Sequence, residues 1–323
     1  MITLGDLGEF GFIDRVAKLI SKHPDVIEGV GDDCAVVRAG DHVWLATADL
    51  SIQNIHFRWD KTTPQDLGWK AVSVSLSDIA AMGGVPRFAV ATVAARPDMD
   101  ADALAGVVQG MVAACESAGA ALVGGDTTRS DGGLVLDTFV LGEAPGGRYI
   151  TRAGAQPGDI IAVTGWPGRS AAGLHALEHG LEAPDELVKA HTRPQARLQA
   201  GQWLREQLGV HALIDVSDGI VQDAGHIAER SHCAIDIDNK TLPIHDLLRD
   251  YCGEHGLNAN DLALTGGEDY ELLVAYAPDA ELPDQFSAVC NLPLTPIGRC
   301  AAGPAEVRVN GKRLSRGGYD HFR

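Results

Sequence analysis

The chain has 323 residues, of which 45% are apolar and 22% charged, and its 26 basic and 44 acidic side chains give a net charge of −18. This composition is typical of a globular protein and excludes the disordered and fibrous classes. Single hydrophobic cores stop growing near ~250–300 residues, so we expect two domains. The acidic balance, without a Lys/Arg-rich run, argues against nucleic acid or an anionic membrane surface as the main partner.

The first half of the chain alternates between helical and strand patterns. We expect helices at 10–22, 64–82 and 100–118, and strands at 43–50, 88–95, 120–124 and 134–142. Pro64 suits the first turn of its helix, and Gly83-Gly84 suits its end. Residues 143–159 hold four glycines and two prolines, which is typical of a connection between domains. The predicted domains are therefore 1–146 and 147–323.

The second half repeats this mixture. We expect strands at 160–165, 211–216, 234–238 and 270–277, and helices at 169–180, 195–208, 219–231 and 244–255. Asn310-Gly311 lies between two short alternating runs and predicts a hairpin turn. The fold class indicated is mixed α/β.

The cysteines and the N-terminus indicate where the protein works. The six cysteines are scattered, with no C-x-x-C pair, so we expect reduced thiols and neither a zinc ribbon nor a disulfide framework. Residues 1–12 include Asp6 and Glu9 and lack the basic and apolar regions of a secretory signal. No uncharged apolar stretch approaches ~18 residues. We therefore expect a cytoplasmic protein.

Aspartates at special positions carry the strongest functional signal. They lie at the ends of apolar strands, in Gly-rich turns or in a small apolar stretch: Asp32, Asp33, Asp49, Asp78, Asp126, Asp215 and Asp218. Each one alone could be a turn residue, a helix N-cap, a surface acid or the partner of a buried arginine. Clustered together, they would raise one another's pKa values, and a divalent cation would relieve that repulsion.

The acidic pattern favours Mg²⁺ and a nucleotide. Hard Mg²⁺ prefers oxygen ligands and usually lies between one or two carboxylates and substrate phosphates. The phosphate-binding P-loop, the protein-kinase motifs and the dinucleotide fingerprint G-x-G-x-x-G are all absent. The residues by themselves therefore predict an acidic metal site in a two-domain α/β protein.

A set of motifs in fixed order extends this interpretation. They are G-D-D at 31–33, T-A-D at 47–49, H-F at 56–57, S-D-I-A-A-M-G at 77–83, G-G-D-T at 124–127, T-R-A-G-A-Q-P-G-D at 151–159, D-V-S-D-G at 215–219, G-G-E-D-Y-E-L at 266–272 and G-Y-D-H-F at 318–322. With these motifs the chain resembles, over essentially its whole length, the thiamine-monophosphate kinase family of the aminoimidazole ribonucleotide synthetase-like superfamily.

The resemblance implies a fold and a reaction. The fold is a two-domain one in which the N-terminal sheets of a homodimer pair into a barrel. The reaction is the ATP- and Mg²⁺-dependent phosphorylation of thiamine monophosphate to the diphosphate by direct in-line transfer, the last step of thiamine diphosphate biosynthesis. The second pKa of a phosphate monoester is near ~6, so the acceptor oxygen is largely deprotonated at neutral pH and needs no general base. Several Mg²⁺ ions would neutralise the two anionic substrates.

The resemblance also assigns residues. The metal ligands that it implies are Asp33, Thr47, Asp49, Asp78, Asp126, Asp215 and Asp218. The nucleotide contacts are Gly125, Asp126, Arg152 and Ser217, and the thiamine phosphate contacts are His56, Glu268 and Tyr319. Asp78, Asp126 and Arg152 form the catalytic set, with Arg152 neutralising phosphate because a guanidinium pairs with its oxygens in two-pronged fashion.

Ordinary interpretations and other functions stay open. His56 could be a strand-end histidine, Glu268 a turn acid and Tyr319 an anchor of the C-terminus. Residues 51–55 depart from the usual family pattern, although Asn54 tolerates the left-handed backbone of that turn. The alternatives are another ATP-dependent enzyme of the superfamily with a different phosphorylated substrate, or a non-catalytic Mg²⁺/ATP-binding module. No cysteine precedes residue 34 and none ends the chain, unlike the selenophosphate and hydrogenase-maturation relatives.

Overall fold

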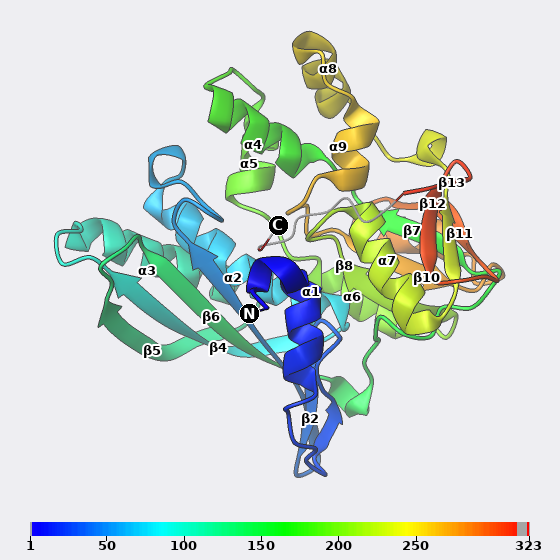
Figure 1. Cartoon of the computed structure of the whole chain (residues 1–323), viewed down its shortest axis with the longest axis horizontal. Helices are drawn as coiled ribbons and strands as arrows, with labels where there is room; N and C mark the ends of the chain where they lie inside the picture. Colours follow the sequence, from blue (N-terminus) through cyan, green and yellow to red (C-terminus); the bar gives the residue numbers. More distant parts are fainter. Residues whose placement is uncertain (1, 315–321, 323) are drawn as a thin grey trace.

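The computed structural model describes residues 2–314 and 322, and two sheets organise them (Figure 1). The first sheet has the strand order β1-β2-β3-β6-β4-β5, and its neighbours are antiparallel except for the parallel pair β4 and β5. Its strands are β1 (Val26–Glu28), β2 (Ala35–Ala39), β3 (His42–Ile52), β4 (Val85–Ala95), β5 (Ala121–Arg129) and β6 (Val135–Glu143).

Two helices, α2 (Pro64–Ala81) and α3 (Ala101–Ser117), cover one face of this sheet (Figure 1). Their apolar sides bury Leu76, Ile79 and Met111 against the strands. The two helices approach closely at glycine, because a Cβ on Gly68 would lie 1.8 Å from the carbonyl oxygen of Val107. This tight crossing fixes α2, which carries several polar side chains of the candidate site.

The second sheet has the order β13-β12-β9-β11-β7-β10-β8, and its described neighbours are antiparallel except for the parallel pair β9 and β12. Its strands are β7 (Ile160–Thr164), β8 (Val210–Asp215), β9 (Ala234–Ile237), β10 (Leu272–Tyr276), β11 (Leu294–Ala301), β12 (Glu306–Val309) and β13 (Lys312–Arg313). Every residue of β10 is buried, because helices pack on both faces of this sheet.

The helices of the second half form two groups. Helix α7 (Ile220–Ser231) packs on one face of the second sheet, and α6 (Leu198–Arg205) and α10 (Leu282–Cys290) pack on the other. A separate group of helices lies above the sheets in Figure 1: α4 (Arg169–His179), α5 (Asp185–Thr192), α8 (Asp246–His255) and α9 (Ala259–Thr265). Ala80 and Ala81 of α2 belong to the same apolar cluster as α6, so α2 joins the two halves.

The N-terminal helix differs from its prediction. Helix α1 (Leu4–Ala17) begins six residues earlier than the expected helix at 10–22 and also ends earlier. Thr3 caps it, with its hydroxyl accepting from the backbone N–H of Asp6 and the Asp6 carboxylate accepting from the backbone N–H of Thr3. The expected start missed this capping box, which lies before the apolar residues that defined the prediction.

The other expected elements are confirmed within a few residues of their predicted bounds, but several elements of the structure were not predicted. The strand expected at 120–124 continues to Arg129 as an exposed edge strand. Strands β1, β2 and β11 and helices α5, α9 and α10 were not predicted, because they are short or, in β11, interrupted by Pro296 and Gly298. The hairpin at Asn310-Gly311 is confirmed between β12 and β13.

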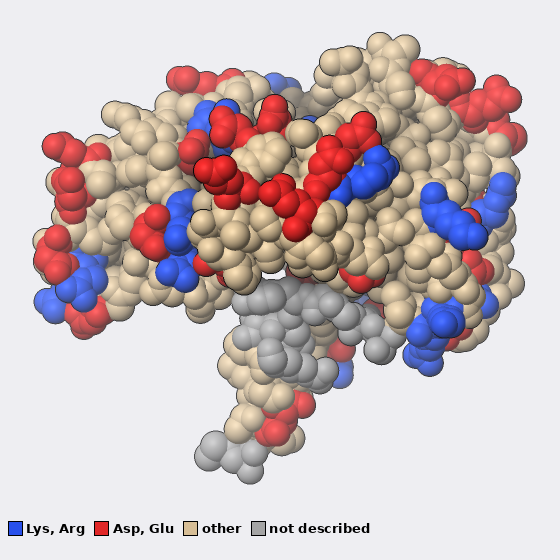
Figure 2. All heavy atoms as spheres, turned by 90° about the horizontal axis from the view of Figure 1, so that it is seen from above, with Lys and Arg blue, Asp and Glu red and all other residues tan. Residues whose placement is uncertain are grey.

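The cysteines lie mostly in the interior, and many charged side chains lie on the surface. All six cysteines are free, as predicted, and five are buried. Within residues 2–314 and 322, no helix combines the length and apolar character needed to cross a bilayer. Acidic side chains gather over the middle of the face seen in Figure 2, with basic side chains close to several of them.

Candidate active site

Three aspartates from distant parts of the sequence meet at the junction of the two halves. Asp33 lies just before β2, Asp78 lies in α2 and Asp215 is the last residue of β8. One carboxylate oxygen from each lies within 4.8 Å of the others. Asp33 and Asp215 are buried, and Asp78 is half-buried. The fold therefore brings together three of the seven predicted metal ligands.

Burial and mutual repulsion control the protonation of these carboxyls. Burial, and then the charges of Asp49, Asp215 and Asp33, hold the pKa of Asp78 well above its ordinary value. Burial and the charge of Asp33 raise the pKa of Asp215 to about 8. Without a cation, the cluster is thus stabilised by keeping protons.

Hydroxyl groups on and beside α2 orient the acids. Ser77 donates a hydrogen bond to Asp215 (2.7 Å), and Ser75 donates one to Asp49 (2.7 Å). The hydroxyl of Thr47, on β3, donates to Asp78. Burial raises the pKa of Asp49 to about 6, against the Ser75 hydrogen bond that lowers it. Thr47 and Asp49 therefore adjoin the cluster, and Ser75 and Ser77 are polar partners that the sequence analysis missed.

Arg152 contacts the cluster directly. Its Nη2 donates to Asp33 Oδ1 (2.7 Å), and its backbone N–H lies 3.2 Å from both carboxylate oxygens of Asp32. Burial disfavours the charged guanidinium, but Asp33, Asp215 and Asp32 outweigh burial and raise the pKa of Arg152. Among the described residues, Asp33 Oδ2 and Arg152 Nε are buried without a hydrogen-bond partner. A buried polar atom without a partner is rare in native structures, so these two atoms mark a place where a further group can bind.

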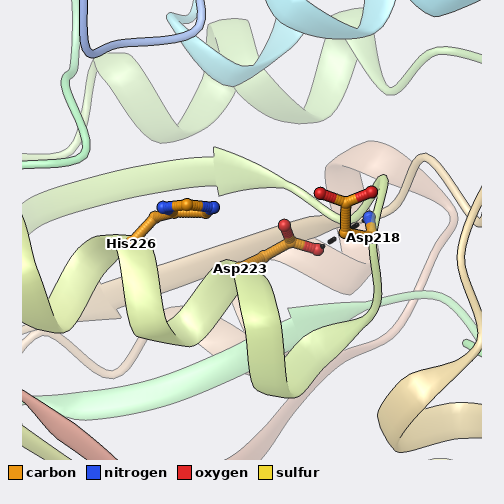
Figure 3. Close-up of side chains that lie close together, drawn as sticks. All are labelled: Asp218, Asp223 and His226. Atoms are coloured by element: carbon orange, nitrogen blue, oxygen red, sulfur yellow. Dashed lines mark hydrogen bonds between the residues drawn. The ribbon is translucent and has the colours of Figure 1, made fainter. Parts of the chain in front are cut away.

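Asp218 belongs to a second group. It follows β8 and lies beside Asp223 and His226 of α7, with one ligand atom of each within 4.8 Å of the others (Figure 3). The backbone N–H of Asp218 donates to Asp223 (3.2 Å), and the Gln222 amide donates to the Asp218 carboxylate (2.8 Å). Asp223 and His226 are three residues apart on one helix face, a spacing that could have identified them from the sequence.

Gly125 and Asp126 lie on β5 and are not part of the group formed by Asp33, Asp78 and Asp215. Asp126 is exposed and pairs in register with Thr92 of β4, so it is a strand residue and not a helix N-cap. By strand alternation its side chain lies on the sheet face that α2 and α3 leave open. A Cβ on Gly125 would lie 1.7 Å from the carbonyl oxygen of Ala91, so close strand packing alone already requires glycine there.

Two of the three predicted substrate residues lie near each other. Glu268 accepts a hydrogen bond from Lys70 Nζ (2.9 Å) and lies 3.2 Å from His191 Nδ1. Burial acts to raise the pKa of Glu268, but Lys70, His191 and His56 outweigh it and lower that pKa. His56 lies in the turn after β3, where Asn54 adopts the expected left-handed backbone (φ 67°). Tyr319 lies outside the described residues.

Ser217 and Tyr270 connect the substrate residues to the acids. The backbone N–H of Glu268 donates to the carbonyl of Ser217 (2.7 Å), the predicted nucleotide contact. Burial, followed by Glu268, Asp49, Asp215 and Asp78, holds the pKa of Tyr270 well above its ordinary value. The charges of both regions therefore act on Tyr270, and the backbone hydrogen bonds of Glu268 to Ser217 and of Tyr270 to Val216 link the loop before β10 to the segment after β8.

Known proteins are similar to this chain in sequence and in fold. The family model "AIR synthase related protein, N-terminal domain" matches residues 31–144, and "AIR synthase related protein, C-terminal domain" matches residues 156–310. Thiamine-monophosphate kinase of Aquifex aeolicus is 35% identical over 99% of this chain and 100% of the relative. The enzyme of the same name from Escherichia coli K12 is 38% identical over 98% of both chains.

A solved structure described as AaThiL complexed with AMPPCP and TMP is similar throughout. It is 34% identical in sequence, superposes with a TM-score of 0.90 and covers 99% of both chains. The similarity therefore extends over both sheets and the junction between them.

Proposed function

The chain belongs to the thiamine-monophosphate kinase family of AIR synthase related proteins, and we propose from this membership that it binds thiamine monophosphate and ATP at the junction described above. It is an ATP-dependent phosphotransferase that converts thiamine monophosphate to thiamine diphosphate. The convergence of Asp33, Asp78 and Asp215 beside Arg152 is the observation that best supports this location for the reaction.

The residues at the junction fit Mg²⁺. Asp33 Oδ2 is buried and has no partner among the described groups, and the three clustered carboxylates offer only oxygen, the donor that Mg²⁺ prefers. Asp33, Asp78 and Asp215 would hold one ion, with Asp49 and Thr47 beside them. Asp218, supported by Asp223, offers oxygens for a second position. When bound, Mg²⁺ supplies the positive charge that lets two anionic phosphates approach each other.

The protein's own groups then have simple tasks. Arg152 contacts the transferring phosphoryl group, because its Nε is buried and free of any described partner. The acceptor phosphate is already largely ionised at neutral pH, so no side chain has to remove a proton. Catalysis in this arrangement consists of positioning and charge neutralisation. Gly125, Asp126 and Ser217 remain proposed nucleotide contacts, and His56, Glu268 and Tyr319 remain proposed substrate contacts.

The open face of the first sheet supports a homodimer. It exposes large apolar side chains by 38–58%: Leu50, Phe88, Val90, Val123 and Phe139. Phe139 pairs in register with Ala48 on one side and Val90 on the other, so the apolar row crosses three strands. Exposed apolar areas of this kind are typical of protein–protein interfaces. Pairing of two such faces would produce the predicted barrel.

The dimer is tested at the centre of that row. Phe139→Glu places a charge in the proposed interface and should weaken dimerisation at least about 100-fold, as measured by light scattering over a concentration series. Val112→Glu, on the outer side of α3 with Val112 37% exposed, is the matched control and should leave the dimer intact. A wild-type protein that stays monomeric at every concentration would contradict the proposal.

The reaction is tested by product and by-product together. Thiamine monophosphate, ATP and Mg²⁺ should yield thiamine diphosphate and one equivalent of ADP. Release of ADP that does not depend on thiamine monophosphate would favour the related ATP-dependent enzymes. Binding of ATP without any ADP release would favour the non-catalytic module.

Two predictions from the sequence stay predictions. The boundary between 1–146 and 147–323 falls between the last strand of the first sheet, β6, and the first strand of the second, β7. The second of these predictions is the cytoplasmic location of the protein.

A further inference from the structure

A closed ring of three side chains surrounds Glu268. Lys70 comes from α2 of the first half, whereas His191 of α5 and Glu268, in the loop before β10, come from the second. Lys70 Nζ lies 2.9 Å from Glu268 Oε1, His191 Nδ1 lies 3.2 Å from Glu268 Oε2, and Lys70 Nζ lies 3.5 Å from His191 Nε2. Each member therefore contacts the other two.

The protonation states follow from the geometry. Burial, and then the charge of Lys70, lower the pKa of His191 to about 4, so its imidazole is neutral at neutral pH. An ionised carboxylate can only accept, so the proton of His191 lies on Nδ1, which donates to Glu268. The lone pair on Nε2 then faces the ammonium group of Lys70. All three contacts are satisfied in this one tautomer, which fixes the orientation of the carboxylate.

The backbone under Glu268 is also held in an unusual form. Glu268 and Tyr270 adopt left-handed backbone, with φ of 62° and 50°. Hydrogen bonds from their N–H groups to Ser217 (2.7 Å) and Val216 (2.8 Å) hold this conformation. Between them, Asp269 accepts from the backbone N–H of Gly168 (2.6 Å) at the start of α4. Backbone strain of this kind persists where the surroundings impose it, and it is concentrated at functional sites.

The three side chains differ in access to solvent. The side chains of Lys70 and His191 are only 8% and 9% exposed, whereas that of Glu268 is 28% exposed. A ligand can therefore reach the carboxylate but not the two groups behind it. Lys70 also compensates the charge of Glu268, so the pair is electrically neutral. Such a pair suits the acceptance of hydrogen bonds better than the neutralisation of a cationic ring.

We propose that Lys70 and His191 are positioning residues that hold Glu268 as the hydrogen-bond acceptor for the amino group on the pyrimidine ring of the substrate. This inference rests on the proposed function. Each oxygen of a carboxylate has two lone pairs. The contacts with Lys70 and His191 use one lone pair on each oxygen of Glu268, which leaves one on each free to accept a hydrogen bond from a ligand. The role of Lys70 and His191 is therefore selectivity for the amino-bearing heterocycle.

The test compares two substrates. Thiamine monophosphate carries the pyrimidine amino group, and oxythiamine monophosphate carries oxygen in its place. Lys70→Met and His191→Gln should raise KM for thiamine monophosphate at least about tenfold, the effect of losing a well-oriented hydrogen bond to a charged group. KM for ATP should not change. The preference of the wild-type enzyme for the amino substrate should fall by a similar factor in both variants.

A double-variant cycle separates positioning from general stability. If Lys70 acts through Glu268, Lys70→Met should add little to KM in a Glu268→Gln background. Lys70→Arg, which keeps the charge, should recover part of the selectivity. Lys189→Met is the matched control, because Lys189 lies on the same helix as His191 and its side chain is 67% exposed. If Lys70→Met fails to fold, Lys70→Arg and His191→Gln carry the test.

The outcomes separate a failure of the positioning role from a failure of the proposed function. Unchanged selectivity in active, folded variants, or additive effects in the double variant, would overturn the positioning role and leave the kinase assignment intact. A folded wild-type enzyme that forms no thiamine diphosphate would overturn the proposed function, and this inference with it.

Discussion

The cluster around Asp78 and the ring around Glu268 both bury charge at the junction of the two halves, but they handle it in opposite ways. In the cluster, three carboxylates meet and Arg152 contacts only one of them directly. In the ring, one carboxylate is matched by one ammonium group and one neutral imidazole. The negative charge of the cluster is therefore not balanced by the protein groups that the structure describes, whereas the charge of Glu268 in the ring is balanced by Lys70.

This difference separates a metal-binding region from a recognition region. Buried charges that lack partners raise carboxyl pKa values and cost folding free energy until a cation binds. Buried charges that have partners hold a side chain in one orientation and need nothing further. The same protein thus keeps one region ready for Mg²⁺ and another rigid for the organic substrate.

The largest expected effect comes from breaking the cluster. Asp78→Asn should reduce turnover at least about 100-fold, because it removes a charged ligand from the centre of the metal site. The fold should survive, since burial holds the pKa of Asp78 well above its ordinary value and asparagine resembles the protonated acid. Product formation and thermal unfolding in EDTA measure the two effects.

Asp131→Asn is the control for this variant, because Asp131 is 85% exposed and forms a surface ion pair with Arg129. It should retain wild-type turnover. Wild-type rates in Asp78→Asn would show that Asp78 is not a metal ligand.

Without a divalent cation, the carboxyl cluster should make the free energy of unfolding depend on pH. In EDTA, the folded state holds protons on Asp49, Asp32 and Asp215, whose pKa values are raised to about 6, 7 and 8. The unfolded state has already lost these protons, so the free energy of unfolding should fall as pH rises from 5 to 8, by about 1.4 kcal/mol per pH unit for each of these carboxyls that is still protonated in the folded state. Denaturant titrations at each pH measure it.

Added Mg²⁺ replaces those protons, so it should stabilise the protein more at pH 8 than at pH 6. An equal effect of Mg²⁺ at both pH values would mean that the cation does not bind these carboxyls.

The ring should give a smaller effect of opposite sign. The pKa of His191 is lowered to about 4, so the folded state binds fewer protons there than the unfolded state between pH 4 and 6.5. This term makes stability fall as the pH falls. His191→Gln should remove it, and the slope between pH 5 and 6.5 should change by up to about 1 kcal/mol per pH unit. An unchanged slope would mean that the imidazole is not held neutral by burial.

The sequence predicted most of the regular elements, because their apolar periods are long and clear. Helix α2, with Pro64 at its start and Gly83 just after its end, was predicted almost to the residue. Short elements such as β1 and α9 carry too few apolar positions to show a period. Strand β11 contains Pro296 and Gly298, which local propensity reads as loop, yet its place between β7 and β9 makes it a strand.

The candidate site was predicted in its chemistry and only partly in its membership. Asp33, Asp78 and Asp215 were expected as ligands and do lie together. Lys70 and His191 were not expected, because a lysine and a histidine within helices show no sign in the sequence of facing each other. Asp126 was expected in the same set but lies on the open face of the first sheet.

The sequence by itself determined which groups are present: aspartates next to apolar strands, too few cations to neutralise them, and the G-G-E-D-Y-E-L motif of the family. The tertiary structure alone decided which of them share a site, because α2 brings Ser77 to Asp215 and Lys70 to Glu268, partners more than a hundred positions away in the sequence. Local sequence fixes periodicity and backbone preference, whereas the partner of a buried charge depends on how the two halves pack.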